Sequence, residues 1–289
     1  MFTLKNNEVT AEFDALGAEL RSLKTADGTE YLWQGDAAYW NGRAPNLFPI
    51  VGRLTEGGYT YRGQTFEMNL HGFARKSAFV VVEKSAKKIV FALTENEATL
   101  KSYPFPFLFT VTYKLTGGTL ETVYGVENTG IGELLSTVGG HPGFFVPVGG
   151  EGDFTDWYLQ FEPKHGATAL VMSSACFVTD KTEPFPLPDG RLPLSHGLFD
   201  DDAIVLKDMP ETVTLKSDKS KRSVTVKYAG MKYLGLWHKP KSDAPYICIE
   251  PWASVPSDDG VTDDLETKRD MVRLKPGERY ERGFSITVV

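Results

Sequence analysis

The sequence has little of what several large classes of protein depend on. Among its 289 residues there are only two cysteines, Cys176 and Cys248, and they lie too far apart in the chain to suggest a disulfide framework. Lysine and arginine number 31 against 38 acidic residues, which leaves a net charge of −7. Because nucleic-acid binding rests on clustered basic residues and no basic run is present, we expect no nucleic-acid partner.

Long apolar runs are absent as well. No stretch approaches the ~18 apolar residues that cross a bilayer as a helix. The chain turns polar within its first residues, Met1–Val9, so no signal peptide is expected. The scarcity of cysteine fits a reducing compartment. The sequence therefore predicts a cytoplasmic protein without a membrane partner, and it leaves open whether that protein is a monomer or a homodimer.

Motifs for the common cofactors are missing too. The sequence holds no nucleophile elbow, no Walker loop, no paired-histidine zinc motif and no paired-cysteine motif. The glycines that precede His141 are not followed by a helical pattern, so they do not form a dinucleotide-binding loop. We therefore expect neither a cofactor nor a metal site.

Aromatic and turn-forming residues, by contrast, are plentiful. Aromatics make up 12% of the chain, and there are 28 glycines and 17 prolines. This composition favours strands over long helices, and apolar residues indeed alternate with polar ones along many segments, as in Val9–Phe13. Helical periodicity is limited to a short turn at Asn96–Ser102, which Pro104 and Pro106 stop.

Neighbouring alternating segments pair as predicted hairpins. Their turns lie at Arg62-Gly63, at Lys84–Lys87 and at Gly117-Gly118. Strands that pair with their sequence neighbours predict an all-β fold, a large antiparallel β-sandwich, as one domain over residues 1–289. The proline-rich stretch Glu183–Leu194 keeps several apolar residues, so we interpret it as an ordered surface loop, not as a linker.

Two of the segments with unusual polar residues precede the middle of the chain. Arg53 follows an apolar run within Pro45–Leu54 and, if buried, needs a carboxylate or a ligand as its partner. His71 lies in Leu70–Arg75 between an apolar residue and a glycine, and taken alone it is interpreted as a histidine of the core.

The two other segments carry residues suited to proton transfer. His141 lies in a glycine-rich turn between two predicted strands, where backbone or ligand can approach closely. Glu250 is expected at the end of an apolar strand, just before Pro251, an expensive place for a carboxylate unless it has a use. Trp237 and Trp252 add aromatic faces that could stack on a sugar ring, although tryptophan is more often part of a core.

The remaining histidines carry weaker signals. His165 lies in a polar turn, His196 is ambiguous, and His238 either flanks a site or lies exposed. A histidine, a glutamate, an arginine and aromatic faces in a β-sandwich indicate acid–base chemistry on a neutral polar small molecule.

The order of these segments resembles that of the aldose 1-epimerase (galactose mutarotase) family, and within it the bacterial branch associated with lactose operons. The likeness runs over essentially the whole chain, and it implies the fold of that family, the galactose mutarotase-like supersandwich. The segments that carry it are PNLFPIVGRL (45–54), LHGFAR (70–75), TLKSYPFPF (99–107), GGHPGFFVP (139–147), LFDDDAIVL (198–206), LGLWHKP (234–240) and YICIEPWAS (246–254).

The resemblance implies a role for each matching residue. It makes Glu250 the general base and His141 the general acid of a reaction that interconverts α and β anomers of a hexose through the open chain. It makes Arg53, His71, Asp202 and Trp237 substrate-binding residues, with Asp201 as the alternative to Asp202. Glu250 is expected to be ionised and His141 protonated, helped by a nearby carboxylate. The segments around Arg53 and His141 differ from those of the better-known galactose mutarotases, so the sugar stays open.

Three other functions are compatible with the sequence. An epimerase for a phosphorylated hexose would need converging basic residues, for which Arg43, Arg75 and Lys76 are candidates. A non-catalytic sugar-binding or sugar-sensing protein could use the same fold, although it would not need an acid and a base together. A glycosidase would need a second carboxylate beside Glu250, and no motif supplies one.

Overall fold

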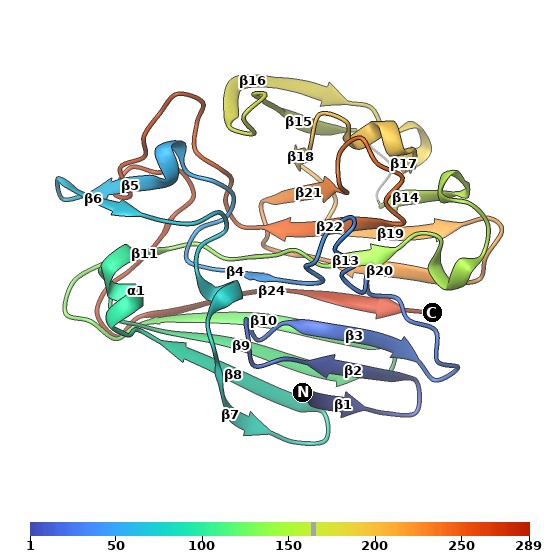
Figure 1. Cartoon of the computed structure of the whole chain (residues 1–289), viewed down its shortest axis with the longest axis horizontal. Coiled ribbons are helices and arrows are strands. Elements are labelled where there is room, and N and C mark those ends of the chain that lie inside the picture. The colour runs from blue at the N-terminus through green and yellow to red at the C-terminus, as the bar shows by residue number, and fades with distance from the viewer. Residues whose placement is uncertain (163–165) are drawn as a thin grey trace.

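Antiparallel strands make up most of the fold, as the alternating pattern predicts (Figure 1). The computed structural model describes residues 1–162 and 166–289. Its largest sheet has nine strands in the order β17-β14-β19-β20-β24-β10-β9-β8-β7. In that order they span Arg191–Pro193, Trp157–Phe161, Thr212–Ser217, Ser223–Lys227, Arg279–Val288, Thr119–Asn128, Phe107–Thr116, Lys88–Thr94 and Val80–Lys84.

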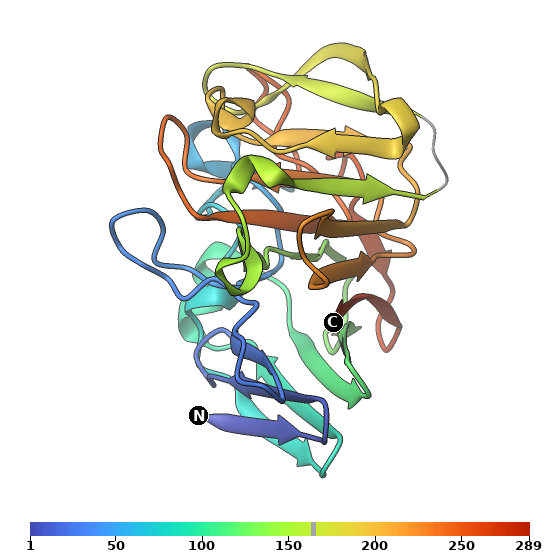
Figure 2. The same cartoon turned by 90° about the vertical axis from the view of Figure 1, so that its right-hand side faces the viewer.

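A second sheet of eight strands carries the site described below. Its order is β16-β15-β18-β21-β22-β12-β4, and β13 pairs with β22 as well. These strands span Val178–Phe185, Ala167–Met172, Ile204–Lys207, Tyr233–Trp237, Tyr246–Trp252, Gly139–Gly140, Asn46–Leu47 and, for β13, Gly143–Phe145. The views in Figures 1 and 2 show this sheet lying over part of the larger one.

One continuous apolar core joins the two sheets. It contains Val213 and Val226 from the nine-stranded sheet together with Leu236, Ile247 and Ile249 from the eight-stranded sheet, all fully buried. Burial of apolar side chains between two sheet faces is what holds a β-sandwich together, so the predicted fold class is confirmed.

Small sheets and short helical turns complete the fold. Three small sheets are formed by β1 (Phe2–Lys5), β2 (Val9–Phe13) and β3 (Leu20–Thr25), by β5 (Gly58–Tyr61) and β6 (Gln64–Glu67), and by β11 (Leu134–Ser136) and β23 (Val272–Leu274). The 3₁₀ turns are η1 (Thr55–Gly57), η2 (Ala74–Lys76), η3 (Val148–Gly150), η4 (Phe154–Asp156), η5 (Pro188–Gly190) and η6 (His196–Phe199). Helix α1 (Glu97–Ser102) confirms the predicted helical turn, and the Asn96 side chain caps it by accepting from two backbone amides. No helix among the described residues is long and apolar enough to cross a membrane.

Two local predictions need correction. The stretch Glu183–Leu194 is not simply a loop: it contains the end of β16, the turn η5 and the short strand β17. Glu250 does not end its strand, because β22 continues through Pro251 to Trp252. Proline is tolerated inside a strand where a backbone N–H is not needed for pairing. Pairing of β22 with β12 and β13 is interrupted between these two strands, so Pro251 lies where no N–H is needed.

Strand β22 divides its side chains between two environments. Ile247 and Ile249 point into the core between the sheets, as predicted. Side chains alternate across a strand, so Cys248, Glu250 and Trp252 lie on the opposite face of the sheet. That face carries the candidate site.

Candidate active site

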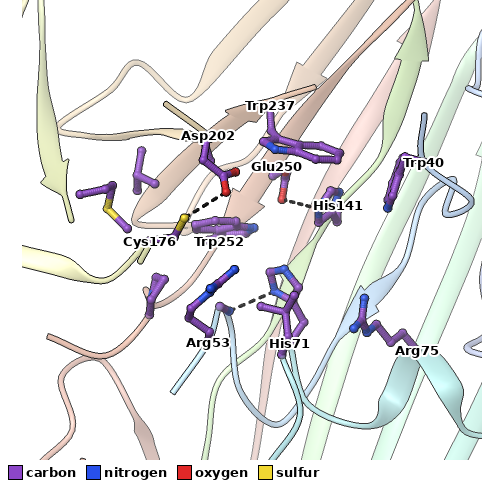
Figure 3. Close-up of a pocket in the computed structure, with 16 residues that line it drawn as sticks. Trp40, Arg53, His71, Arg75, His141, Cys176, Asp202, Trp237, Glu250 and Trp252 are labelled. Atoms are coloured by element: carbon purple, nitrogen blue, oxygen red, sulfur yellow. Dashed lines mark hydrogen bonds and ion pairs between the residues drawn. The ribbon is translucent and has the colours of Figure 1, made fainter. Parts of the chain in front are cut away.

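The candidate site residues meet in one pocket on the eight-stranded sheet (Figure 3). The cavity has a volume of about 290 Å³, near the small end of the range for small-molecule sites. All six residues assigned from the sequence line it, namely Arg53, His71, His141, Asp202, Trp237 and Glu250. They come from segments spread over most of the chain, so the fold alone brings them together.

Backbone pairing fixes the two residues proposed for proton transfer. Glu250 lies on β22 opposite Gly235 of β21, and a Cβ at Gly235 would lie 3.3 Å from the Cβ of Glu250. His141 lies in the gap between β12 and β13, where its backbone amide donates to the Pro45 carbonyl at 3.1 Å. Both residues are therefore held by the sheet and not by a mobile loop, as expected of a preorganised site.

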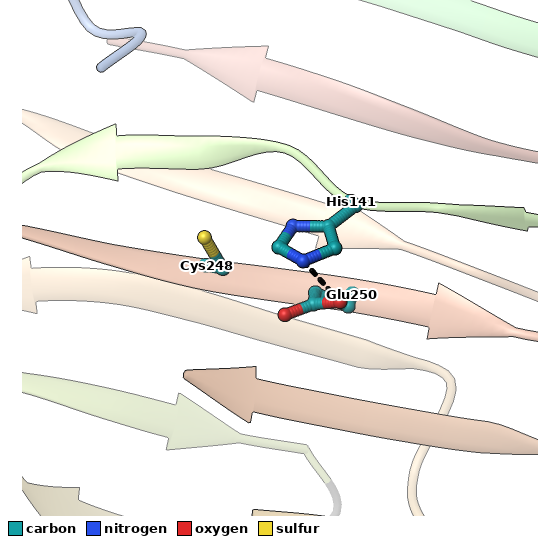
Figure 4. A group of neighbouring side chains, drawn as sticks. All are labelled: His141, Cys248 and Glu250. Carbon is teal, nitrogen blue, oxygen red and sulfur yellow. Dashed lines mark ion pairs between the residues drawn. The ribbon is translucent and has the colours of Figure 1, made fainter. Parts of the chain in front are cut away.

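His141 and Glu250 form a close, dry pair (Figure 4). The distance from His141 Nε2 to Glu250 Oε2 is 3.2 Å, and the two side chains are only 11% and 1% exposed. Glu250 Oε2 and His141 Nδ1 are buried, and neither has a hydrogen-bond partner within the described protein. Buried polar atoms usually have partners, so these two side chains lack hydrogen bonds that a ligand in the pocket could supply.

Burial changes the ionisation expected of this pair. Removal of water raises the pKa of Glu250 well above its usual value and lowers the pKa of His141 to about 3. Both shifts favour the uncharged form, so burial opposes the expected pairing of an ionised glutamate with a protonated histidine. In its uncharged form the pair has one proton that can pass across the 3.2 Å contact between Glu250 Oε2 and His141 Nε2.

His71 is a neutral hydrogen-bond donor that faces the pocket. The backbone N–H of Gly52 donates to His71 Nδ1 at 3.0 Å, so Nδ1 carries no proton and Nε2 does. Burial, with the nearby charges of Arg75 and Arg53, lowers the pKa of His71 well below its usual value. The simpler interpretation of His71 as a core histidine holds for its burial, but its ring also lines the pocket.

Asp202 is the aspartate that reaches the pocket. The alternative, Asp201, is exposed and is not among the lining residues. The thiol of Cys176 donates to Asp202 Oδ2 at 3.0 Å, and burial together with this carboxylate raises the pKa of the thiol to about 11. Cys176 therefore acts as a hydrogen-bond donor on Asp202 and not as a reactive thiolate.

Three residues of the pocket have strained backbones. His71, Cys176 and Asp202 adopt positive φ angles of 61°, 62° and 78°. A non-glycine residue in this region costs on the order of 1–3 kcal/mol and persists only where its surroundings hold it. Seven other described non-glycine residues have positive φ outside the pocket, so this feature shows that the three lining residues are held firmly by their surroundings.

Aromatic rings form one wall of the site. Trp40 stacks on His141 with ring centroids 4.9 Å apart and an interplanar angle of 27°, and Trp237 meets His141 edge-on at 5.9 Å. Trp252 lies 6.0 Å from His71. Such rings exclude water and offer flat apolar faces to a sugar.

Trp40, Arg75 and Cys176 line the pocket, although the sequence analysis did not place them in the site. Arg75 follows His71 by four residues and ends Leu70–Arg75, one of the segments that carry the family resemblance. The sequence analysis considers Arg75 only as a candidate phosphate ligand. Trp40 and Cys176 lie in no such segment and gave no signal.

One set of side chains in the described structure could hold a metal ion. His141, Cys248 and Glu250 offer ligand atoms within 4.8 Å of one another (Figure 4). Burial and Glu250 raise the pKa of the Cys248 thiol well above its usual value, so this donor is a protonated thiol and a poor ligand. A metal here would also occupy the atoms that form the contact between His141 and Glu250.

His196 and His238 are not among the residues that line the pocket. His238 is fully buried, which corrects the suggestion of an exposed position; its Nδ1 lies 2.7 Å from the Lys239 carbonyl. His196 Nδ1 lies 3.2 Å from His238 Nε2, and the His196 ring stacks on Phe154. His165 lies outside the described residues.

Comparison with known proteins identifies the relatives of this chain. The family model described as aldose 1-epimerase matches residues 1–287. The chain is 32% identical to the chromosomal LacX protein of Lactococcus lactis over 99% of this chain and 98% of that one. A galactose mutarotase related enzyme from Lactobacillus acidophilus has 36% identity and a TM-score of 0.95, and covers 100% of this chain and 97% of its own. A galactose mutarotase-like protein from Lactobacillus casei has 32% identity and a TM-score of 0.92, with both chains fully covered.

Proposed function

The chain belongs to the aldose 1-epimerase family, and from that premise we propose that it is a mutarotase, an isomerase that interconverts the α and β anomers of a hexose. The observation that carries the proposal is the contact between His141 Nε2 and Glu250 Oε2, 3.2 Å apart in a pocket that both side chains line. An acid and a base held together and open to a ligand are what ring opening requires.

The pair can run the reaction without exchanging protons with solvent. When the sugar binds, its hydroxyl groups stabilise the ionic form of the pair, in which the proton has passed from Glu250 to His141. Glu250 then removes the proton from the C1 hydroxyl while His141 Nε2 protonates the ring oxygen. The C1–O5 bond breaks, C1 becomes an aldehyde, and the pair returns to its neutral form.

Ring closure reverses these transfers. Rotation about the C1–C2 bond presents the other face of the aldehyde, the C5 hydroxyl attacks it, His141 recovers the proton from O5, and Glu250 returns one to O1. The charge of the pair stays at zero before and after each step, which suits a site from which water is excluded. Each positioned proton transfer contributes on the order of 10²–10⁴ to the rate.

The other residues hold the sugar while this happens. His71 Nε2–H is a donor to a sugar oxygen, because its tautomer is fixed by the Gly52 amide. Asp202 accepts from sugar hydroxyls, and the Cys176 thiol orients it. Arg53 donates to sugar oxygens, and Trp237 supplies an apolar face.

Polarimetry tests the proposal directly. The protein should accelerate the change in optical rotation of freshly dissolved α-glucose or α-galactose. His141→Asn and Glu250→Gln should each lower kcat by about 10²-fold or more, since each removes one positioned proton transfer. His196→Asn and the exposed Glu67→Gln are matched controls outside the pocket and should keep full activity.

Two outcomes of these measurements would contradict the proposal. Saturable binding of the sugar without acceleration would identify a non-catalytic sugar-binding protein instead. Full activity in both His141→Asn and Glu250→Gln would show that the proton-transfer roles are assigned to the wrong residues.

A further inference from the structure

Two guanidinium groups line the candidate pocket without a polar partner. Among the described residues, neither Arg53 nor Arg75 forms a side-chain hydrogen bond or an ion pair, and Arg75 Nε is buried. Both residues are partly buried, and a cationic group that loses water is normally paired, because desolvation of an uncompensated charge is costly. The cost shows in Arg75, whose pKa burial lowers.

This lack of partners is particular to the pocket. Every other arginine except Arg62 binds an acceptor through its guanidinium group; Arg43, for example, donates to Gln34 Oε1 at 2.9 Å and to the Arg21 carbonyl at 2.7 Å. Arg62 lies at the surface over the ring of Tyr61.

Glu19, the acidic residue whose charge acts on Arg75, already accepts hydrogen bonds from other groups. Glu19 raises the pKa of Arg75 through its charge, so it lies within electrostatic reach. Its Oε2 accepts from Arg21 at 2.6 Å, and its Oε1 accepts from the backbone amides of Arg43 and Ala44 at 3.0 Å. Glu19 therefore leaves the charge of Arg75 to be met from the pocket.

The position of Arg75 indicates which part of a sugar it would meet. Arg75 lies on the side of the pocket that holds His141 and Trp40, whereas Arg53 lies toward Cys176 and Asp202 (Figure 3). In an aldopyranose the ring oxygen is bonded to C5, which carries C6. A sugar whose ring oxygen meets His141 therefore directs its C6 substituent toward this same side.

We propose that the preferred substrate is an aldose with an anionic group at C6, either a phosphate ester or a carboxylate, and that Arg75 binds that group. This inference rests on the proposed mutarotase activity and specifies its substrate. It also changes the earlier set of phosphate-binding candidates, because Arg43 is engaged by the protein and Lys76 is exposed and does not line the pocket. Charge-assisted bonds to a planar guanidinium are the strong and specific means of recognising such anions.

The test compares kcat/KM for three sugars that differ at C6: glucose, glucose 6-phosphate and glucuronate. The spontaneous rate of each sugar is subtracted, and the buffer contains no phosphate. The wild-type protein should favour one anionic sugar over glucose by about tenfold or more, and the favoured one identifies the anion. This preference should shrink as salt is added.

Arg75→Gln should reduce the preference by about tenfold, because the loss falls mainly on the anionic sugar. Lys76→Gln removes the same charge one residue away and should leave the preference unchanged. Titration of the three sugars into Glu250→Gln measures binding without turnover and should give the same order of affinities.

The outcomes distinguish this inference from the proposed function. A protein that acts on glucose as well as on both anionic sugars, with no effect of Arg75→Gln on the ratio, would overturn the inference and keep the mutarotase. Tighter binding of an anionic sugar without acceleration of any sugar would overturn the mutarotase and keep the anion-binding role of Arg75. Absence of both binding and acceleration would overturn both.

Discussion

Replacement of Glu250 by glutamine should make the protein more stable, and increasingly so as the pH rises. Glu250 is 1% exposed, and burial raises its pKa. In the unfolded chain the same carboxyl titrates near ~4.3. Between these two values the folded protein retains a proton that the unfolded chain has released, so the stability contributed by the protonated carboxyl is lost as the pH rises. Glu250→Gln lacks this group and escapes the loss.

The size of the effect follows from proton linkage. Each pH unit within this window adds at most about 1.4 kcal/mol to the stability of Glu250→Gln relative to wild type. From about pH 5 to about pH 7 the difference should therefore grow by up to ~2.7 kcal/mol, provided that the folded pKa lies above this range.

His141 contributes in the opposite direction. Its pKa is lowered to about 3, so the folded state binds fewer protons than the unfolded chain, and stability is lost as the pH falls below about 6.5. Both proteins contain His141, so this contribution cancels in the difference between them. His141→Asn should show the isolated glutamate effect, a loss of stability as the pH rises above about 4.3.

Urea denaturation of wild type and Glu250→Gln at several pH values measures the difference, and the exposed Glu67→Gln serves as the control for a change of one carboxyl. Glu67→Gln should differ from wild type by a nearly constant amount over the same range. A flat or falling difference for Glu250→Gln between pH 5 and pH 7 would mean that the folded protein does not hold a raised pKa at this position. The neutral pair, and the mechanism built on it, would then be wrong.

Three further predictions concern the site and its frame. After subtraction of the spontaneous reaction, kcat/KM should stay level as the pH falls through ~6.5, because the pair gains a second proton only at much lower pH; an inflection near 6.5 would contradict this. Cys176→Ala should raise KM several-fold with less effect on kcat, since Asp202 loses its orienting donor, and Cys176→Ser should restore KM; an equal fall in kcat would indicate a different role. Gly72→Ala should lower the free energy of unfolding by about 1–3 kcal/mol because of the positive φ, and by more because the new Cβ would meet the Phe48 carbonyl. Gly57→Ala has a similar φ but its Cβ would meet open space, so it should cost less in the same urea denaturation.

Local sequence patterns predicted the strands because the signal for a strand is local. The alternation along Phe107–Leu115 and Leu120–Val126, with two glycines between them, specifies a hairpin, and β9 and β10 pair in that register. The sheet order was beyond reach for the opposite reason. The pairing of β24 with β20 and of β12 with β22 joins segments far apart in the chain, and nothing in either segment names its partner.

The site was predicted to the extent that single residues signal it. Glu250 stood out as a carboxylate in an apolar strand, and the six assigned residues do share one pocket. Their ionisation was not predictable in this way. The default charges of glutamate and histidine hold in water, whereas here Trp40 and Trp237 pack against the ring of His141, and Glu250 is 1% exposed. Dehydration is a property of the assembled pocket, so only the fold could reveal that burial favours the uncharged form of both groups.

Arg75 shows the same limit from the side of binding. As a sequence position it was one of three cations with equal claims, and Arg43 and Lys76 have the same charge. What distinguishes Arg75 is that no acceptor in the described protein meets it, while Gln34 and a backbone carbonyl hold Arg43 and solvent surrounds Lys76. Whether a charged group lacks a partner depends on all the groups around it, including Glu19, whose oxygens already accept from other donors. Substrate preference in this fold can therefore depend on a residue whose own segment looks ordinary, and the balance of partners around each pocket cation is the quantity to compare among relatives of this chain.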